Sequence, residues 1–187
     1  MAPTPTEGPH VTEPQPPIEP DTKDWTWVLV RPCAECGTDV SAMGPKDVAA
    51  AVRDSLPRWR AALERPHVAQ RPDPATWSPL EYGAHVRDVF RVMRFRLDLM
   101  LTTENPEFPD WDQDATALED AYAEQDPPAV VVALADAGRA FADGLEAVRR
   151  RDCERMGRRS NGSVFTVETL ARYAWHDVAH HLHDVGA

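Results

Sequence analysis

Hydrophobic residues recur at spacings of three and four along four stretches of the chain, and this pattern predicts four amphipathic helices. The stretches begin at Pro45, Ser78, Asp126 and Thr166. The first is predicted to end near Arg65, with a kink or a break at Pro57 because proline lacks the N–H of a helical hydrogen bond. An alternating pattern typical of strands is almost absent. The sequence therefore predicts an all-α four-helix bundle over residues 45–187.

The predicted helices start at capping signals. Ser78 is followed by a proline and by Glu81 in capping-box register, and this helix is predicted to run to about Thr103. Asp126 precedes two prolines, and Thr166 is expected to cap the last helix, which should reach the end of the chain. Between the second and third helices, NPEFPDWDQD predicts an extended connection.

Two segments precede the predicted bundle. Residues 1–24 contain seven of the 18 prolines and almost no large apolar residue, so we expect a flexible, disordered tail. Residues 25–44 open with WTWVLVRP, which predicts an extended segment packed against the domain. The same segment contains PCAECG, in which Cys33 and Cys36 form a CxxC pair.

Composition excludes several classes of protein. A formal net charge of −11 over 187 residues argues against nucleic-acid binding, which requires a basic surface. No stretch approaches the roughly 20 apolar residues of a membrane span, and the N-terminus lacks the pattern of a signal peptide. We therefore expect a cytoplasmic protein without a membrane partner. Three cysteines, an odd number, argue against a disulfide framework.

The second predicted helix carries a histidine on its apolar face. Projected at about 100° per residue, His85 shares that face with Val89 and Val92. A single inward histidine is more often a core residue than a metal ligand. Asp88, nearly one turn further along, is placed to orient His85, which fits both interpretations.

The last predicted helix is rich in histidine, but its apolar stripe separates these residues into two groups. Asp177 and His181 are four residues apart on the flank of the stripe and are placed to bind one ion together with His85. His176 and His180 are also four residues apart but project away from the stripe. We therefore expect them, with His183, to face water.

These stretches resemble motifs of the DinB superfamily, whose metal-binding four-helix bundles include YfiT-like proteins and mycothiol-dependent maleylpyruvate isomerases. The resemblance covers the chain from about residue 45 to 185 and rests on WSPLEYGAHVRD and DVAHHLHDV. It implies that His85 matches the family's histidine on the second helix, and that Asp177 and His181 match the pair on the last helix.

The isomerase branch of that family has glutamate, histidine and aspartate at the spacing of Asp177, His181 and Asp184, so this chain resembles it with a shorter first carboxylate. A register on His176 and His180 would instead give a site of three histidines. Either set leaves coordination positions open, as catalytic metal sites do.

The resemblance implies a metal-dependent enzyme that activates a low-molecular-weight thiol such as mycothiol, or water, for transfer, isomerisation or hydrolysis of a small electrophilic metabolite. The ligand types favour zinc, with nickel or iron as alternatives. Asp88 and Asp184 are the candidates to orient a ligand histidine through a hydrogen bond or to transfer a proton. The alternative is a non-catalytic bundle that stores, senses or is held together by a metal. Bundles of this type commonly form homodimers through a helix face.

Two further features remain open in the sequence. The CxxC pair is half of a zinc site, to be completed by Cys153, His10 or His67, or it is a redox pair, or it is inert. An island of arginines is a candidate anchor for an anionic partner or a solvated loop. Its members are Arg149, Arg150, Arg151, Arg155, Arg158 and Arg159. Three aromatic residues, Tyr82, Trp111 and Tyr173, are candidates to line a pocket mouth or are core residues.

Overall fold

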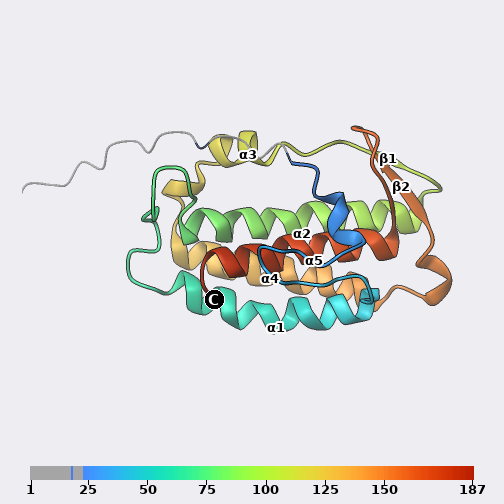
Figure 1. Ribbon diagram of the computed structural model, residues 1–187, viewed down its shortest axis with the longest axis horizontal. Coiled ribbons are helices and arrows are strands. Elements are labelled where there is room, and N and C mark those ends of the chain that lie inside the picture. The colour runs from blue at the N-terminus through green and yellow to red at the C-terminus, as the bar shows by residue number, and fades with distance from the viewer. Residues whose placement is uncertain (1–17, 19–22) are drawn as a thin grey trace, which may run out of the picture.

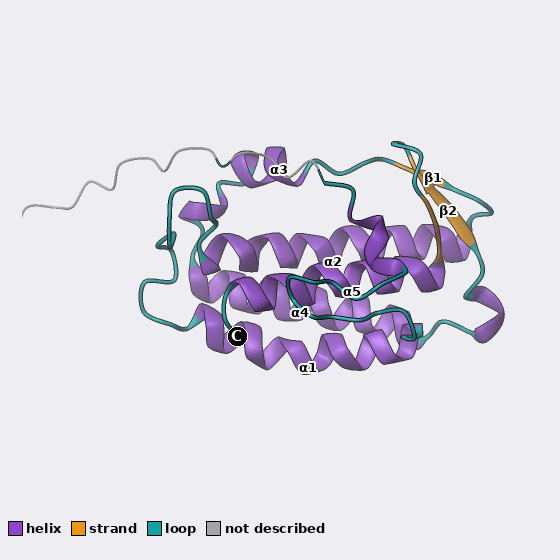
Figure 2. Cartoon of the chain, viewed as in Figure 1, coloured by secondary structure: helices purple, strands orange, loops and turns teal. Residues whose placement is uncertain are grey.

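The structure, a computed structural model, describes residue 18 and residues 23–187. Four long helices form the predicted bundle (Figures 1 and 2). They are α1 (Pro45–Leu63), α2 (Pro79–Thr102), α4 (Pro127–Glu146) and α5 (Val167–Asp184). The predicted tail, residues 1–24, lies outside the described residues except for its positions 18, 23 and 24. Within the described part of the chain, no helix is long and apolar enough to cross a membrane.

Consecutive helices are not always neighbours in this bundle. The main contacts join α1 to α4 and α5, and α2 to the same two helices. As a result α1 and α2 lie diagonally opposite each other. This arrangement places α2 beside α5, and these two helices carry the predicted metal ligands.

The predicted caps are present. Ser78 accepts a hydrogen bond from the Glu81 N–H, and the Glu81 carboxylate accepts one from the Ser78 N–H at 2.8 Å. Arg71 holds the same carboxylate from the preceding loop. Asp126 and Thr166 likewise cap α4 and α5 through their side chains. These local signals fix where each helix starts, and therefore which of its residues face the core.

Some segments differ from the sequence-based expectation. Residues Trp25–Leu29 form a short 3-10 helix, η1, where an extended segment was predicted. Helix α1 continues through Pro57 without a break. The connection between α2 and α4 contains helix α3 (Gln113–Glu119) and the 3-10 turn η2 (Tyr122–Glu124). These short elements cover one side of α2 (Figure 1).

A small sheet, not predicted from the sequence, closes one end of the bundle. Strand β1 (Glu107–Phe108) pairs in parallel with β2 (Met156–Arg159), which pairs antiparallel with β3 (Val164–Thr166). The 3-10 turn η3 (Arg150–Asp152) leads into it from α4. The strands are too short for an alternating pattern to stand out in the sequence. The sheet joins the connection between α2 and α4, which contains β1, to the connection between α4 and α5, which contains β2 and β3.

Candidate metal centre

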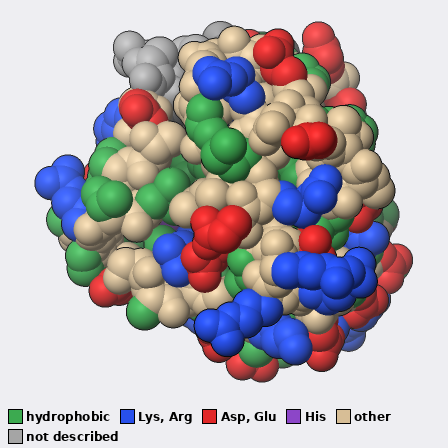
Figure 3. All heavy atoms as spheres, turned by 90° about the vertical axis from the view of Figure 1, so that its right-hand side faces the viewer, with side chains coloured by type: hydrophobic (Ala, Val, Ile, Leu, Met, Phe, Trp, Pro, Cys, Tyr) green, Lys and Arg blue, Asp and Glu red, His purple; other side chains and the backbone are tan. Residues whose placement is uncertain are grey.

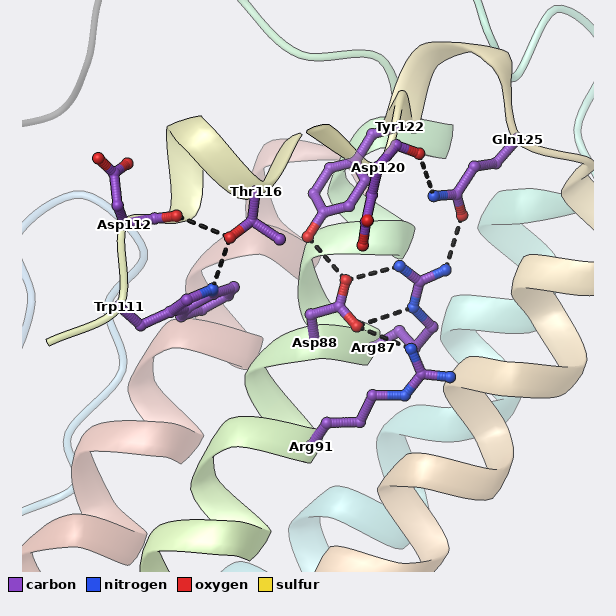
Figure 4. A network of polar contacts seen from close by, with 9 residues as sticks. All are labelled: Arg87, Asp88, Arg91, Trp111, Asp112, Thr116, Asp120, Tyr122 and Gln125. Atoms are coloured by element: carbon purple, nitrogen blue, oxygen red, sulfur yellow. Dashed lines mark hydrogen bonds and ion pairs between the residues drawn. The ribbon is translucent and has the colours of Figure 1, made fainter. Parts of the chain in front are cut away.

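His85 lies at the centre of the candidate site. Its side chain is fully buried on the face of α2 that meets α5. The imidazole stacks nearly parallel on the Trp111 ring, with centroids 5.4 Å apart, and Trp77 contacts it at 5.3 Å. Trp111 is fixed in turn because its Nε1 donates a hydrogen bond of 2.8 Å to Thr116 in α3 (Figure 4). The connection between α2 and α4 therefore holds the histidine ring in place.

Two residues of α5 meet this histidine. His85 Nε2 lies 3.4 Å from Asp177 Oδ1, and the same oxygen lies 3.6 Å from His181 Nε2. One ligand atom from each of the three residues lies within 4.8 Å of the others. The structure thus brings together the three residues that the sequence singled out, from two helices that are neighbours only in the folded chain.

Three polar atoms of this group lack hydrogen-bond partners within the described structure. Both ring nitrogens of His85 and Oδ1 of Asp177 are buried and unpaired. Leaving such groups unsatisfied costs about 1–3 kcal/mol each, so buried polar atoms without partners require an explanation. A cation bound between them would satisfy Asp177 Oδ1 and one nitrogen of His85. The donor set of two imidazoles and a carboxylate suits a divalent metal ion.

The charge states of these residues also fit a cation site. Burial lowers the pKa of His85 although Asp177 opposes the shift, so the imidazole is neutral near pH 7. Burial by itself would raise the pKa of Asp177, but His85 and His181 outweigh it and lower the pKa overall. A neutral imidazole and an ionised carboxylate are the forms that bind metals.

Asp184 supports His181 from behind. Its Oδ2 lies 2.8 Å from His181 Nδ1, so the ring N–H donates to the carboxylate. This contact leaves Nε2 as the free nitrogen, directed toward Asp177. A carboxylate hydrogen-bonded to the outer nitrogen is the usual support of a ligand histidine. Asp184 is therefore placed to orient His181, and its role in a metal site stays a prediction.

Asp88 lies in a separate network. Its carboxylate accepts hydrogen bonds from Arg87, from Arg91 at 2.9 Å and from the Tyr122 hydroxyl at 2.7 Å (Figure 4). Both ring nitrogens of His85 lack a hydrogen-bond partner in the described structure, so Asp88 is not bonded to His85. The oxygens of Asp88 are thus occupied by groups that tie α2 to η2. This geometry favours a structural role over the proton-transfer role expected from the sequence.

A cavity opens beside the three residues. It has a volume of about 820 Å³, and Asp177 and His181 form part of its wall. Tyr82, Trp111 and Tyr173 also line it, which favours the first of the two alternatives that the sequence left open for them. His85 lies behind this wall, fully buried. The candidate centre therefore has one side closed by the core and one side open to the cavity.

The arginine island does not form a single site. Arg149, Arg150, Arg151 and Arg158 are exposed, and basic side chains on this end of the molecule are interspersed with acidic ones (Figure 3). Only one of the six arginines, Arg159, lines the cavity. It lies 3.4 Å from Asp110 and above the ring of Tyr173. The other members are spread over η3, β2 and the residues next to them, and Arg155 donates hydrogen bonds to the backbone oxygens of Met100 and Thr103.

The expectation that His176 faces water is wrong. His176 is only 4% exposed, and His180 is partly buried, whereas His183 is exposed as expected. The side chains of His176 and His180 face the segment before α1, where Cys33 and Cys36 lie. The sequence had shown both pairs, but it carried no signal that two segments about 140 residues apart would meet.

Comparisons with known proteins agree with this architecture. The family model described as the DinB superfamily matches residues 67–185, more than half of the chain. The solved structure of YfiT from Bacillus subtilis, described as a probable metal-dependent hydrolase with an unusual four-helix bundle topology, is similar in fold. It superposes with a TM-score of 0.67 at 17% sequence identity, covering 76% of this chain and 85% of that chain. No curated protein matches the sequence. On the evidence of the family match, the chain belongs to the DinB superfamily.

Proposed function

We propose that the protein is a metal-dependent enzyme in which His85, Asp177 and His181 hold a divalent ion. Its substrate in this proposal is a small electrophile, and the nucleophile is water or a low-molecular-weight thiol. The observation that carries this proposal is the set of unpaired buried ligand atoms next to an open cavity. A bound divalent ion lowers the pKa of water or of a thiol and so supplies a nucleophile near neutral pH.

The residues of this chain have separate tasks in the proposal. His85 is immobilised between Trp77 and Trp111, which keeps its nitrogen directed at Asp177. Asp184 keeps His181 in the tautomer with a free Nε2. Because Asp184 lines the cavity, it is also the candidate to accept a proton there. The aromatic residues around the opening exclude water from part of the substrate.

The cavity wall indicates a class of substrate. Arg159 is the member of the arginine island that lines the cavity, but its Nε donates to Asn161 and its Nη2 to Ser163, so the guanidinium is already held within the chain. The volume of about 820 Å³ accommodates a small metabolite together with a thiol of the size of mycothiol. Seven acidic residues line the same wall against two basic ones, Lys23 and Arg159, so the wall as a whole favours a small neutral or cationic electrophile over an anionic one.

The rival proposal, a non-catalytic bundle that only stores or senses metal, predicts a closed shell of ligands. The cavity beside Asp177 and His181 favours the enzyme. Zinc as the ion, with nickel or iron as alternatives, remains part of the proposal, as do a cytoplasmic location and a homodimer. Sedimentation of the purified protein tests the dimer.

The first test is the metal content of purified wild type and of His85→Ala, Asp177→Ala and His181→Ala. Each variant is expected to lose about one equivalent of metal, because three ligands are the minimum for such a site. His183→Ala is the matched control, since this exposed histidine lies on the same helix and outside both groups. Asp184→Ala is expected to weaken metal affinity about 10–100-fold without abolishing binding.

Activity is then tested with small ester, amide and maleyl substrates, with and without an added thiol, using the metal-loaded protein. Turnover in wild type that disappears in His181→Ala and persists in His183→Ala supports the enzyme. Metal bound at these residues without turnover of any substrate supports the rival. Full metal content in all three ligand variants would refute the site itself.

A further inference from the structure

We propose that the chain contains a second metal site, a four-ligand structural zinc centre formed by Cys33, Cys36, His176 and His180. The CxxC pair comes from the segment before the bundle, and the histidine pair comes from α5. One ligand atom from each of the four residues lies within 4.8 Å of the others. This site is separate from the group of His85, Asp177 and His181 and does not depend on its function.

The distances fit tetrahedral coordination. Cys33 Sγ lies 3.8 Å from His180 Nδ1, and Cys36 Sγ lies 3.8 Å from His176 Nε2. Zn–S bonds of about 2.3 Å and Zn–N bonds of about 2.0 Å place sulfur and nitrogen about 3.5 Å apart in a tetrahedron. The four side chains are therefore already close to the positions of zinc ligands. Only a small contraction around the ion is required.

The local backbone around the cysteines has the form of a zinc knuckle. Gly37 N donates to Cys33 O at 2.9 Å, and Cys33 N donates to Thr38 O at 2.9 Å, so the chain folds back tightly over the pair. Gly37 has a φ of +74°, a left-handed conformation that glycine adopts without a steric cost. This turn brings both thiols to the same side, facing α5. A pair of thiols arranged in this way binds a metal ion without rearrangement of the backbone.

The surroundings of the histidines also favour a ligand role. His180 Nε2, the nitrogen remote from Cys33, lies 3.6 Å from Glu35 and 3.9 Å from Asp184. Carboxylates near the outer nitrogen orient ligand histidines and increase their basicity. Trp25 packs on both imidazoles, with centroids 5.5 Å from His176 and 5.1 Å from His180. The aromatic ring therefore limits access of water to the proposed ion.

The ligand set distinguishes this centre from the other one. Two thiolates and two imidazoles fill a tetrahedron, and closed Cys2His2 shells are typical of structural zinc. In contrast, the group of His85 has three ligands and an open side toward the cavity. The closed shell indicates a role in folding: it attaches residues 23–44 to α5 (Figure 1). Since Trp25 and Glu35 line the cavity, this attachment also builds part of the cavity wall.

The first test uses wild-type protein stripped of metal under reducing conditions and titrated with Co²⁺ alone. Cobalt bound by two thiolates is expected to give an intense near-ultraviolet charge-transfer band and the strong visible bands of tetrahedral cobalt. Zn²⁺ is expected to displace it and to abolish both features. A spectrum without sulfur-to-cobalt charge transfer overturns the proposal, because the other centre contains no sulfur.

The second test compares variants for zinc content after purification. Cys36→Ser and His180→Ala are each expected to lose about one equivalent of zinc and the charge-transfer band. Cys153→Ser is the matched control, a free and partly buried cysteine outside the group, and is expected to change neither. His85→Ala is expected to retain the charge-transfer band, which separates failure of this site from failure of the proposed enzyme. Unchanged zinc and spectrum in Cys36→Ser refute the site.

A third measurement needs no variant. In wild type, a thiol reagent is expected to modify Cys153 promptly, and to modify the equally accessible Cys36 only after a chelator is added, whereas Cys33 is protected by its burial alone. If the reagent modifies Cys36 at the same rate with and without chelator, the proposal is contradicted. A Cys33–Cys36 disulfide in protein purified under reducing conditions, detected by mass after alkylation, contradicts it as well.

Discussion

At the residue scale, adjacent positions of α5 belong to two different groups. Asp177 and His181 meet His85, whereas His176 and His180 meet the cysteine pair. A step of one residue turns a helix by about 100°, so pairs offset by one position face different neighbours. Asp184 links the groups, because its two oxygens lie 2.8 Å from His181 and 3.9 Å from His180.

Asp88→Ala tests whether Asp88 is structural or catalytic. The change leaves the buried Arg87 without its ion-pair partner and removes the hydrogen bond from Tyr122. We expect a loss of about 3–5 kcal/mol in the free energy of unfolding, measured with urea, and an unchanged metal content. Tyr122→Phe is the control and should cost about 1 kcal/mol. Lost metal with unchanged stability would instead place Asp88 in the site, as the sequence suggested.

The same network predicts a dependence of stability on pH. Burial would raise the pKa of Asp88, but Arg87 and Tyr122 outweigh it, so the folded-state pKa lies below the ordinary value of about 3.9. The contribution of Asp88 is therefore fully present above that pH and is lost as the pH falls toward the folded-state pKa. The difference in stability between wild type and Asp88→Ala should shrink correspondingly in acid.

At the scale of elements, the site depends on how closely the helices approach. Gly83 lies two residues before His85, and a Cβ built there would lie 2.7 Å from a methyl group of Leu63 in α1. Leu63 is only 2% exposed, so it has little room to move. The absence of a side chain at Gly83 thus sets the separation of α1 and α2 at the level of the candidate metal centre.

Gly83→Ala is expected to destabilise the protein by about 1–3 kcal/mol through overpacking and to weaken metal binding at His85. Gly144→Ala in α4 is the matched control. A Cβ there would lie 2.9–3.2 Å from atoms of the long Arg94 side chain, which can shift at the expense of its hydrogen bond to the Ala140 oxygen. The gain in helix propensity of about 1 kcal/mol offsets that cost. Thermal and urea unfolding measure both variants. Equal stability of the two would show that the close approach at Gly83 is not required.

At the scale of the whole molecule, metals would link parts that the chain connects only distantly. The proposed open centre joins α2 to α5, and the proposed zinc centre joins residues 33–36 to α5. A ligand that binds only the folded state stabilises it in proportion to the logarithm of its concentration relative to Kd. Helix α5 would therefore be held from two sides.

Removal of all metal with a chelator is expected to lower the Tm. A metal present at 1,000 times its Kd contributes about 4 kcal/mol, and each kcal/mol shifts the Tm of a chain of this length by about 2–4 °C, so we expect a fall of roughly 10 °C per site. Scanning calorimetry before chelation, after it and after addition of Zn²⁺ measures this change. Elemental analysis must accompany the scans. An unchanged Tm in protein verified to be metal-free would contradict a stabilising role for either centre.

The four helices, their caps at Ser78, Asp126 and Thr166, and the inward position of His85 could all be predicted from the sequence. These features depend on local hydrogen bonds and on a periodicity of 3.6 residues, both of which are readable over short windows. The pairing of Asp177 with His181 was predictable for the same reason. The small sheet was not, because strands of two to four residues show too little alternation.

The partners of these residues follow from the packing of the helices, which no local pattern contains. The diagonal placement of α1 and α2 makes α2 and α5 neighbours, and this brings His85 to Asp177. Contacts between Cys33 and His180 span 147 positions, beyond the reach of any local pattern. The burial of His176 follows from η1 and the cysteine turn covering α5, whereas a helical projection records only the residues of its own helix. Helix propensity and capping depend on neighbouring residues, whereas the contacts between distant side chains depend on how the whole chain packs.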